Sequence, residues 1–377
     1  MGNSFENEIK ELIRKQLSIC DCNIIVNNSQ LLQYIIRKTK PADKDESKAR
    51  KSFANLYAIY AIVEDYVNQG YDTEEKSGTY SKYEGAQYST LIKKIHSMPF
   101  GQKLQNHALN GRMNEEFFGL FPQQQEDGVY PIIRDLKTNR YWINEKYIIV
   151  KADNREFNIS RLILAIINRY AEVIKQKFEK FIEDCNTLQN LDASEIDKVI
   201  DFIKKSLAPD VDARLFEIVS FSILKHYYSD RKIFWGYSKD ELKEDSLKLY
   251  KTGRTNANDG GIDFVMKPLG IFFQVTETLD FKKYFLDIDK VERYPITFVV
   301  KSTETSEKIR DTLRKDAKNA GWCDKITENY MECIEDIINI ADLESYLNDL
   351  NNKGKIPDIL EEMIIQSKVE YNYVDID

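Results

Sequence analysis

The sequence has few histidines and lacks the two matching Cys-x-x-Cys motifs of a zinc site. Its three histidines, His96, His107 and His226, are far apart, which argues against a histidine-rich zinc site or an HNH-type nuclease centre. The five cysteines are an odd number at scattered positions, a pattern typical of reduced thiols in a cytoplasmic protein. Cys20 and Cys22 leave open a metal pair as the alternative to buried or idle thiols.

The sequence also lacks a long apolar run and an excess of positive charge. No run approaches the roughly 20 apolar residues that cross a bilayer, and the first residues, MGNSFENEIK, show no signal-peptide pattern. We therefore expect a cytoplasmic protein with no membrane partner. Lys and Arg number 54 against 62 Asp and Glu, a net charge of -8, so any contact with a polyanion must come from a local basic patch.

Length and composition predict two domains, or one large domain with a helical extension. The chain has 377 residues, of which 42% are hydrophobic and 31% charged, enough for real cores and a solvated surface. We expect a mostly helical region over 1–155. Over 156–377 we expect an α/β domain, a mixed sheet flanked by helices, with further helices near 304–319, 328–350 and 357–367.

The first region contains a pattern typical of a winged helix-turn-helix. Residues 101–118 predict two helices with a break near Gly111, and residues 129–150 alternate like a hairpin with its turn at 137–139. Side chains suited to phosphates and base edges are Lys103, Asn106, Asn110, Arg112 and Asn114, with Arg140 on the wing. The alternative is a solvated helix pair beside a structural hairpin.

In the second region, apolar spacing predicts a succession of helices and strands. Helices are expected over 158–187, 195–206, 211–229 and 281–291, and strands over 232–237, 247–253, 261–267, 270–276 and 295–302. The turn at 267–270 joins two neighbouring strands. Their pairing places Asp263, at the start of one strand, beside Gln274 and Thr276 at the end of the next.

This juxtaposition is suited to a hard dication. A carboxylate beside another oxygen ligand at the rim of a sheet can hold magnesium, which takes few protein ligands. A water on the metal can attack a phosphodiester, and a lysine commonly orients that water. Gly260 and Gly261 leave the backbone open next to Asp263. Asp259 is explained better as an ordinary turn residue than as a metal ligand.

Three short segments together resemble the PD-(D/E)XK nuclease superfamily, and in particular type II restriction endonucleases and the Mrr-like branch. They are DGGIDF at 259–264, FFQVT at 272–276 and the pair Phe216-Glu217, within a resemblance that covers about residues 210–302. The resemblance implies a restriction-endonuclease-like fold. It also implies Mg²⁺ bound by Asp263, Gln274, the backbone carbonyl of Val275 and the helix acid Glu217.

The sequence departs from the family pattern at Thr276, where the family has lysine. Lysines that could reach this position from elsewhere are Lys282 and Lys283 on the next helix, together with Lys251 and Lys301. Glu277 is a candidate further ligand. Glu217 has an alternative explanation as a solvated charge near a helix start.

The resemblance implies a homodimer that uses Mg²⁺ to cut double-stranded DNA at a short site, with a cognate DNA methyltransferase as its genetic partner. Lys251, Arg254 and Asn256, in the loop leading to Asp263, would suit DNA contacts. Two alternatives remain. One is a catalytically degenerate DNA-binding or phage-defence protein on the nuclease fold, and the other is an interaction protein that works through its long helices.

Overall fold

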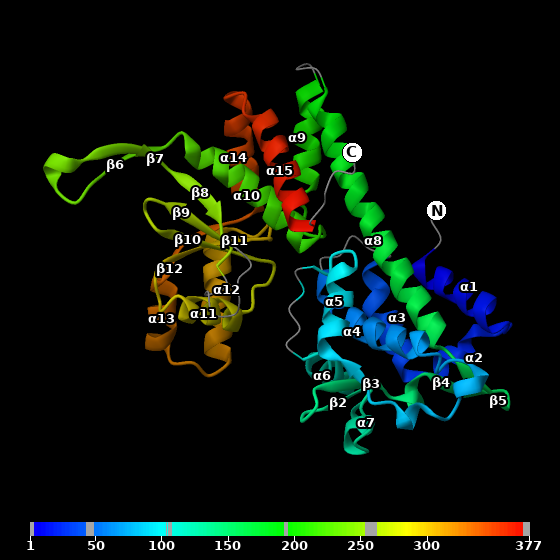
Figure 1. Cartoon of the computed structure of the whole chain (residues 1–377). Helices are drawn as coiled ribbons and strands as arrows, with labels where there is room; N and C mark the ends of the chain where they lie inside the picture. The colour runs from blue at the N-terminus through cyan, green and yellow to red at the C-terminus, as the bar shows by residue number, and fades with distance from the viewer. Residues whose placement is uncertain are drawn as a thin grey trace. The chain divides into compact units, whose positions relative to one another are not determined.

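The computed structural model describes residues 4–42, 49–102, 104, 108–191, 195–252 and 262–371. The chain divides into two compact units, Met1–Lys180 and Phe181–Asp377 (Figure 1). The division falls inside the long helix α8 (Ser160–Gln189), whereas the predicted division lay just before this helix. No helix within these described ranges is long and apolar enough to cross a membrane.

The first unit is mainly helical, as the sequence predicts. Serine and aspartate side chains cap its early helices: Ser4 accepts from the amide of Glu6, and Ser29 from that of Leu32. The apolar stripes of these helices meet in one core, in which Tyr34, Tyr57 and Phe117 are fully buried. Its helices, besides the first part of α8, are α1 (Phe5–Leu17), α2 (Cys22–Asn27), α3 (Gln30–Thr39), α4 (Ala49–Asn68), α5 (Tyr88–Ser97), α6 (Gly111–Leu120) and α7 (Pro122–Glu126).

The predicted hairpin in this unit is confirmed. Strand β2 (Ile132–Asp135) pairs antiparallel with β3 (Arg140–Ile143), and Asp135 stabilises the turn by accepting from the amide of Lys137 and the hydroxyl of Thr138. The short strand β1 (Ala86–Gln87) pairs with the other edge of β3. A separate hairpin is formed by β4 (Ile149–Ala152) and β5 (Arg155–Asn158).

The helix pair predicted around Gly111 is only half present. Helix α6 begins at Gly111 as expected, but the described residues between 101 and 110 lie in turns, bends and irregular backbone. The preceding helix, α5, ends at Ser97, because Met98 is extended before Pro99 and proline disfavours a helical residue before it. The prediction of a first helix in the winged helix-turn-helix is therefore wrong over the described part of 101–110.

The second unit is built on a five-stranded mixed sheet, which confirms the predicted mixed α/β class (Figure 1). Strands β8, β9 and β10 pair antiparallel, and β10, β11 and β12 pair parallel. The strands are β8 (Lys248–Lys251), β9 (Phe264–Lys267), β10 (Ile271–Thr276), β11 (Ile296–Val300) and β12 (Ile334–Ile338), in the spatial order β12-β11-β10-β9-β8. Every residue of the interior strand β11 is buried, as expected for a strand covered on both faces.

Helices cover both faces of this sheet. On one face α10 (Ala213–Ser229) packs with α9 (Ile196–Lys205), α14 (Ile340–Asn352) and α15 (Ile356–Tyr371), and its Phe221 ring lies 5.1 Å from that of Phe264. On the other face lie α11 (Phe281–Lys290), α12 (Ser306–Asn319) and α13 (Asp324–Glu332), where the rings of Tyr284 and Phe298 are 4.4 Å apart. The chain thus passes from α10 through β8, β9 and β10 to α11 and then β11.

The helix predicted over 328–350 is wrong, because the structure places strand β12 inside it. Helix α13 ends at Glu332, and α14 begins at Ile340 with a capping box formed by Asn339 and Asp342. The isoleucines of this stretch, Ile334, Ile337, Ile338 and Ile340, repeat at three and four residues and so imitate a helical stripe. Pairing with β11 decides in favour of a strand.

The segment predicted as a strand at 232–237 does not join this sheet. Strand β6 (Lys232–Trp235) pairs with β7 (Lys243–Ser246), a strand that the sequence analysis did not predict, and the two form a separate two-stranded sheet. This hairpin projects from the second unit (Figure 1).

Candidate functional site

Charged and polar side chains gather at one edge of the five-stranded sheet. Strands β8, β10 and β11 end at this edge, and β9 begins there because it runs antiparallel to both of its neighbours. The first turns of α10 reach the same edge, since Glu217 of α10 pairs with Lys251 at the end of β8. We call this cluster, which comprises Glu217, Lys251, Asp263 and Gln274, the edge site. It lies entirely within the second unit.

Asp263 occupies the start of β9 in the edge site. Its amide donates to the carbonyl of Phe273 and its carbonyl accepts from the amide of Thr252, at 3.1 and 3.0 Å. Its Oδ2 accepts from the amide of Val275 at 2.7 Å. Because Phe264 pairs with Phe273 in antiparallel register, the residue before Phe264, Asp263, lies beside the residue after Phe273, Gln274. The predicted juxtaposition of these two residues is therefore confirmed.

The carboxyl group of Asp263 titrates near neutrality. Burial, and then the negative charge of Glu217, raise its pKa from an ordinary 3.8 to about 7. The amide of Val275 and the cations Arg214 and Lys251 act in the opposite direction but do not outweigh these two effects. A buried acid whose pKa lies near physiological pH is typical of a functional site.

Glu217 is the charged member of this pair of acids. It is 8% exposed, with Lys251 Nζ 3.1 Å from its Oε1 and the Arg214 guanidinium paired with its Oε2. Burial opposes ionisation, but Arg214 and Lys251 outweigh it and lower the pKa of Glu217. The alternative of a solvated charge near the helix start is therefore wrong. Arg214 was missed in the sequence, although its place three residues before Glu217 on a helix was a signal.

Gln274 brings a polar side chain without a complete set of partners. It is 7% exposed, and its Oε1 is buried with no hydrogen-bond partner in the described part of the chain. Its Nε2 makes only a long contact of 3.4 Å with the carbonyl of Val275. A buried acceptor without a partner costs about 1–3 kcal/mol, so a site for a cation or donor is a physical reason for its presence.

One of the candidate lysines reaches the position of Thr276. Lys283, in the first turn of α11, donates from Nζ to Thr276 Oγ1 at 3.2 Å. The neighbouring Lys282 is exposed, because successive helical residues point about 100° apart. Lys301 is buried, donates to the carbonyl of Val211 and lies 3.4 Å from Glu277.

The oxygen groups of the edge site are too few for a cation that requires many protein ligands. Across the described ranges, no three His, Cys, Asp or Glu side chains are grouped closely enough to hold a metal. Asp263, Glu217 and a Gln274 oxygen that has no partner among the described residues nevertheless make two carboxylates and an amide, and magnesium needs only one or two carboxylates. Asp259 lies outside the described residues.

The predicted DNA-contacting residues are spread over both units. Asn110 stands directly before α6, and its buried Oδ1 has no partner among the described residues. Arg112 is exposed and lies 3.3 Å from Glu116. Arg140 donates to the carbonyl of Gly85. Four of the predicted residues lie outside the described part of the chain: Lys103, Asn106, Arg254 and Asn256.

The structure corrects the expectation for Asn114. Its side chain is buried, donates to the carbonyl of Ile132 at 2.9 Å and accepts from the same residue's amide at 3.1 Å. Both hydrogen-bonding groups of the amide therefore hold β2 against α6, and none is left for a base edge.

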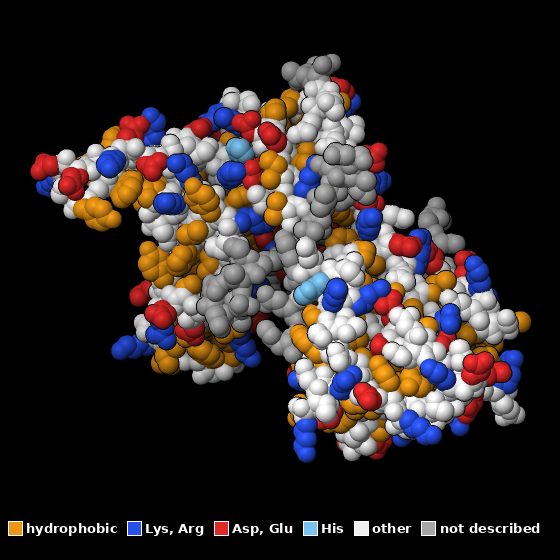
Figure 2. All heavy atoms as spheres, in the orientation of Figure 1, with side chains coloured by type: hydrophobic (Ala, Val, Ile, Leu, Met, Phe, Trp, Pro, Cys, Tyr) orange, Lys and Arg blue, Asp and Glu red, His pale blue; other side chains and the backbone are white. Residues whose placement is uncertain are grey.

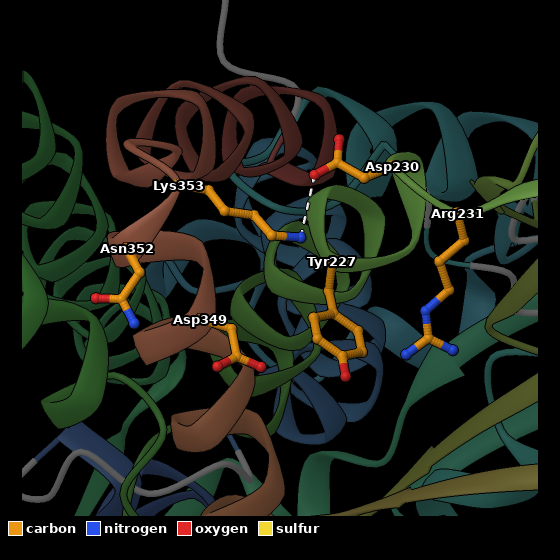
Figure 3. Close-up of a pocket in the computed structure, with 6 residues that line it drawn as sticks. All are labelled: Tyr227, Asp230, Arg231, Asp349, Asn352 and Lys353. Carbon is orange, nitrogen blue, oxygen red and sulfur yellow. Dashed lines mark hydrogen bonds and ion pairs between the residues drawn. The ribbon is translucent and has the colours of Figure 1, made fainter.

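A shallow pocket of about 400 Å³ lies at the other end of α10 from Glu217 (Figure 3). Ten residues along the helix separate Glu217 from Tyr227, which is roughly 15 Å. Asp230 and Lys353 form an ion pair of 3.2 Å, and Arg231 lies over the Tyr227 ring. The pocket is lined by Tyr227, Asp230, Arg231, Asp349, Asn352 and Lys353. Two acids and two bases balance there, so the pocket shows no preference for an ion of either sign.

Comparison of the chain with models of protein families, with curated proteins and with solved structures returned no match.

Proposed function

We propose that the protein is a magnesium-dependent nuclease that hydrolyses phosphodiesters in double-stranded DNA, as a type II restriction endonuclease does. The observation that carries the proposal is the edge site, where Asp263 and Glu217 lie with Lys251 and with a Gln274 oxygen that has no partner within the described ranges. The arrangement of one helix, three antiparallel strands, a helix and a parallel strand supports the resemblance in DGGIDF and FFQVT. On this proposal a cognate DNA methyltransferase protects the host sequence.

Asp263, Glu217 and Gln274 would hold the magnesium ion, with the carbonyl of Val275 as the further ligand implied by the resemblance. When bound, magnesium supplies positive charge that stabilises the phosphate in the transition state. Asp263 must lose its proton to act as a ligand, and its pKa of about 7 makes that loss easy in neutral solution. Lys251 and Arg214 keep Glu217 ionised beside it.

Lys283 is the lysine that we assign to the role left open at Thr276. Its Nζ reaches the Thr276 hydroxyl from the next helix, so an ammonium group occupies the neighbourhood where the family has its lysine. A lysine in this place orients the attacking water by hydrogen bonding and balances the charge that develops on it.

Incubation of the purified protein with unmethylated phage or plasmid DNA, with and without magnesium, tests the proposal. We expect discrete magnesium-dependent fragments, lost in Asp263→Asn, which preserves the shape of the side chain. Lys283→Ala should reduce the cleavage rate by roughly 100-fold or more, the usual scale of such catalysis. Lys282→Ala is the matched control, since this neighbour is exposed on the same helix turn.

The second candidate is a DNA-binding protein that has kept the nuclease fold without its chemistry. Thr276 in the lysine position favours it. In that case DNA stays intact with magnesium across varied substrates, while a gel shift still shows binding. Equal cleavage by the Lys283→Ala and Lys282→Ala variants would instead remove Lys283 from the mechanism and leave the nuclease proposal standing.

A further inference from the structure

The hairpin of β6 and β7, residues 231–247, is a projecting arm. Its strands pair with each other from Lys232 opposite Ser246 to Trp235 opposite Lys243. Ile233 packs partly against the core of the second unit, and the hairpin extends beyond it (Figure 1). A two-stranded hairpin is only marginally stable by itself in water, so a projecting one needs a reason to stay ordered.

The outer part of the arm exposes large apolar side chains. Phe234 is 66% exposed, Trp235 39%, Tyr237 96% and Leu242 53%. Figure 2 shows hydrophobic side chains gathered along one side of the arm. Single exposed apolar residues are ordinary, but four within nine residues form a patch that is typical of an interaction surface.

The charges of the arm indicate a protein partner and argue against DNA. Residues 231–247 contain four basic and four acidic side chains, so the arm is neutral and cannot attract a polyanion. Some of these charges are already used within the arm, as in the ion pair between Lys232 and Glu244. What remains for a partner is the apolar surface.

The two edges of the arm differ in a way that identifies the partner. The free edge of β7 reads Lys-Glu-Asp-Ser, and charged side chains are a common protection of an edge strand against pairing. The free edge of β6 reads Lys-Ile-Phe-Trp, so only its first residue is charged and the three residues that follow lack that protection. It is also complementary to itself. An antiparallel pair of two β6 strands centred on Phe234 places Phe234 opposite Phe234, and Ile233 opposite Trp235, which are favourable cross-strand pairs.

We propose that the arm binds the arm of a second copy of this chain, with the two β6 strands pairing about a two-fold axis. Such an interface is isologous and closes at a dimer. The proposal rests on the proposed function in one respect. Cutting both DNA strands requires two edge sites, and a dimer supplies one from each copy.

Sedimentation velocity over a concentration series tests the arm. We expect the wild-type protein to be a dimer and Phe234→Glu to be a monomer, because the substitution sets two carboxylates face to face at the centre of the pairing. Phe234→Leu should keep the dimer. Leu136→Glu is the control, because Leu136 is a 79% exposed apolar residue in the turn of another hairpin. Circular dichroism and the melting temperature verify that each variant is folded.

Hydrogen exchange gives a second readout that mere destabilisation of the arm would not reproduce. The outward amides of β6 should exchange more slowly at concentrations where the wild-type protein is dimeric than where it is dilute. A wild-type monomer at every concentration, or a dimer that Phe234→Glu leaves intact, overturns the proposal. So does a monomer whose DNA binding depends on Phe234, which would assign the arm to DNA.

Plasmid cleavage separates this proposal from the proposed function. If both hold, the wild-type protein linearises plasmid with magnesium and Phe234→Glu mainly nicks one strand. A dimer that depends on Phe234 with no cleavage under any condition contradicts the nuclease and keeps the arm. Cleavage by a protein whose dimer does not depend on Phe234 supports the nuclease and contradicts the pairing of the arms.

Discussion

At the residue scale, the edge site combines two buried acids that are held in different states of ionisation. Glu217 has two cationic neighbours, Arg214 and Lys251, while Asp263 has chiefly burial and the charge of Glu217 around it. The difference in environment, rather than in chemistry, separates their pKa values. It leaves one acid ready to take up or release a proton near pH 7.

Asp263 therefore makes stability depend on pH. Its folded pKa of about 7 lies above its ordinary value of 3.8, so the folded protein holds a proton that the unfolded chain has lost between these values. Stability falls as pH rises across this window, by about 2–3 kcal/mol between pH 5 and pH 8 in the absence of metal. Asp263→Asn should flatten this slope, as urea unfolding at the two pH values would measure.

The same titration predicts how cleavage depends on pH. On the proposed function the ionised form of Asp263 is the one that binds magnesium, so the magnesium-dependent rate should rise through about pH 7 and then level off. A pH series at a fixed magnesium concentration below saturation checks this expectation, because saturating magnesium would displace the proton at lower pH. A rate that does not change between pH 6 and pH 8 would contradict the assigned role of Asp263.

Asn114 has a structural role that can be separated from DNA binding. Asn114→Ala removes both hydrogen bonds to Ile132 and leaves the two backbone groups of a buried residue without their partner. We expect a loss of about 1–3 kcal/mol of unfolding free energy. Arg112→Ala, two residues earlier on the exposed side, should change stability by less than about 0.5 kcal/mol. Denaturant titration of the two variants makes the comparison.

At the scale of elements, the β12–α14 boundary shows how local chemistry and pairing combine. The capping box of Asn339 and Asp342 starts α14 directly after β12, and the Asn339 side chain also donates to the carbonyl of Glu304. Asn339→Ala should cost about 0.5–2 kcal/mol through the lost cap. Asn339→Ser should recover most of that loss, because serine caps as well, and thermal unfolding would show both effects.

Elements differ in how far the sequence predicts them. Helices α8 and α10 have long apolar stripes, and β8, β9 and β10 have short apolar runs bounded by turns, so their periods are unambiguous. β12 and β7 do not share this clarity. The isoleucines of β12, three and four residues apart, fit a helical period although pairing with β11 makes this segment a strand. The charged β7 is a strand only because β6 pairs with it.

At the scale of the whole molecule, the chain is two compact units of nearly equal length, each with its own core. Such units can unfold separately, so calorimetry should resolve two transitions. On the proposed function, magnesium at the edge site should stabilise only the second unit, by about 2.7 kcal/mol when its concentration is 100 times the dissociation constant. One transition should move upward with magnesium at pH 8, and Asp263→Asn should abolish the movement.

The sequence by itself determined the local features of this protein. Helices such as α8 and α10, the hairpin at 132–143 and the neighbouring placement of Asp263 and Gln274 follow from apolar periods and turn residues over a few positions. Only the tertiary structure decided that Lys283 reaches Thr276, that Arg214 and Lys251 flank Glu217, and that Asn114 is buried. These contacts join elements whose separation and orientation depend on how helices pack on the sheet, and no short-range pattern records that packing.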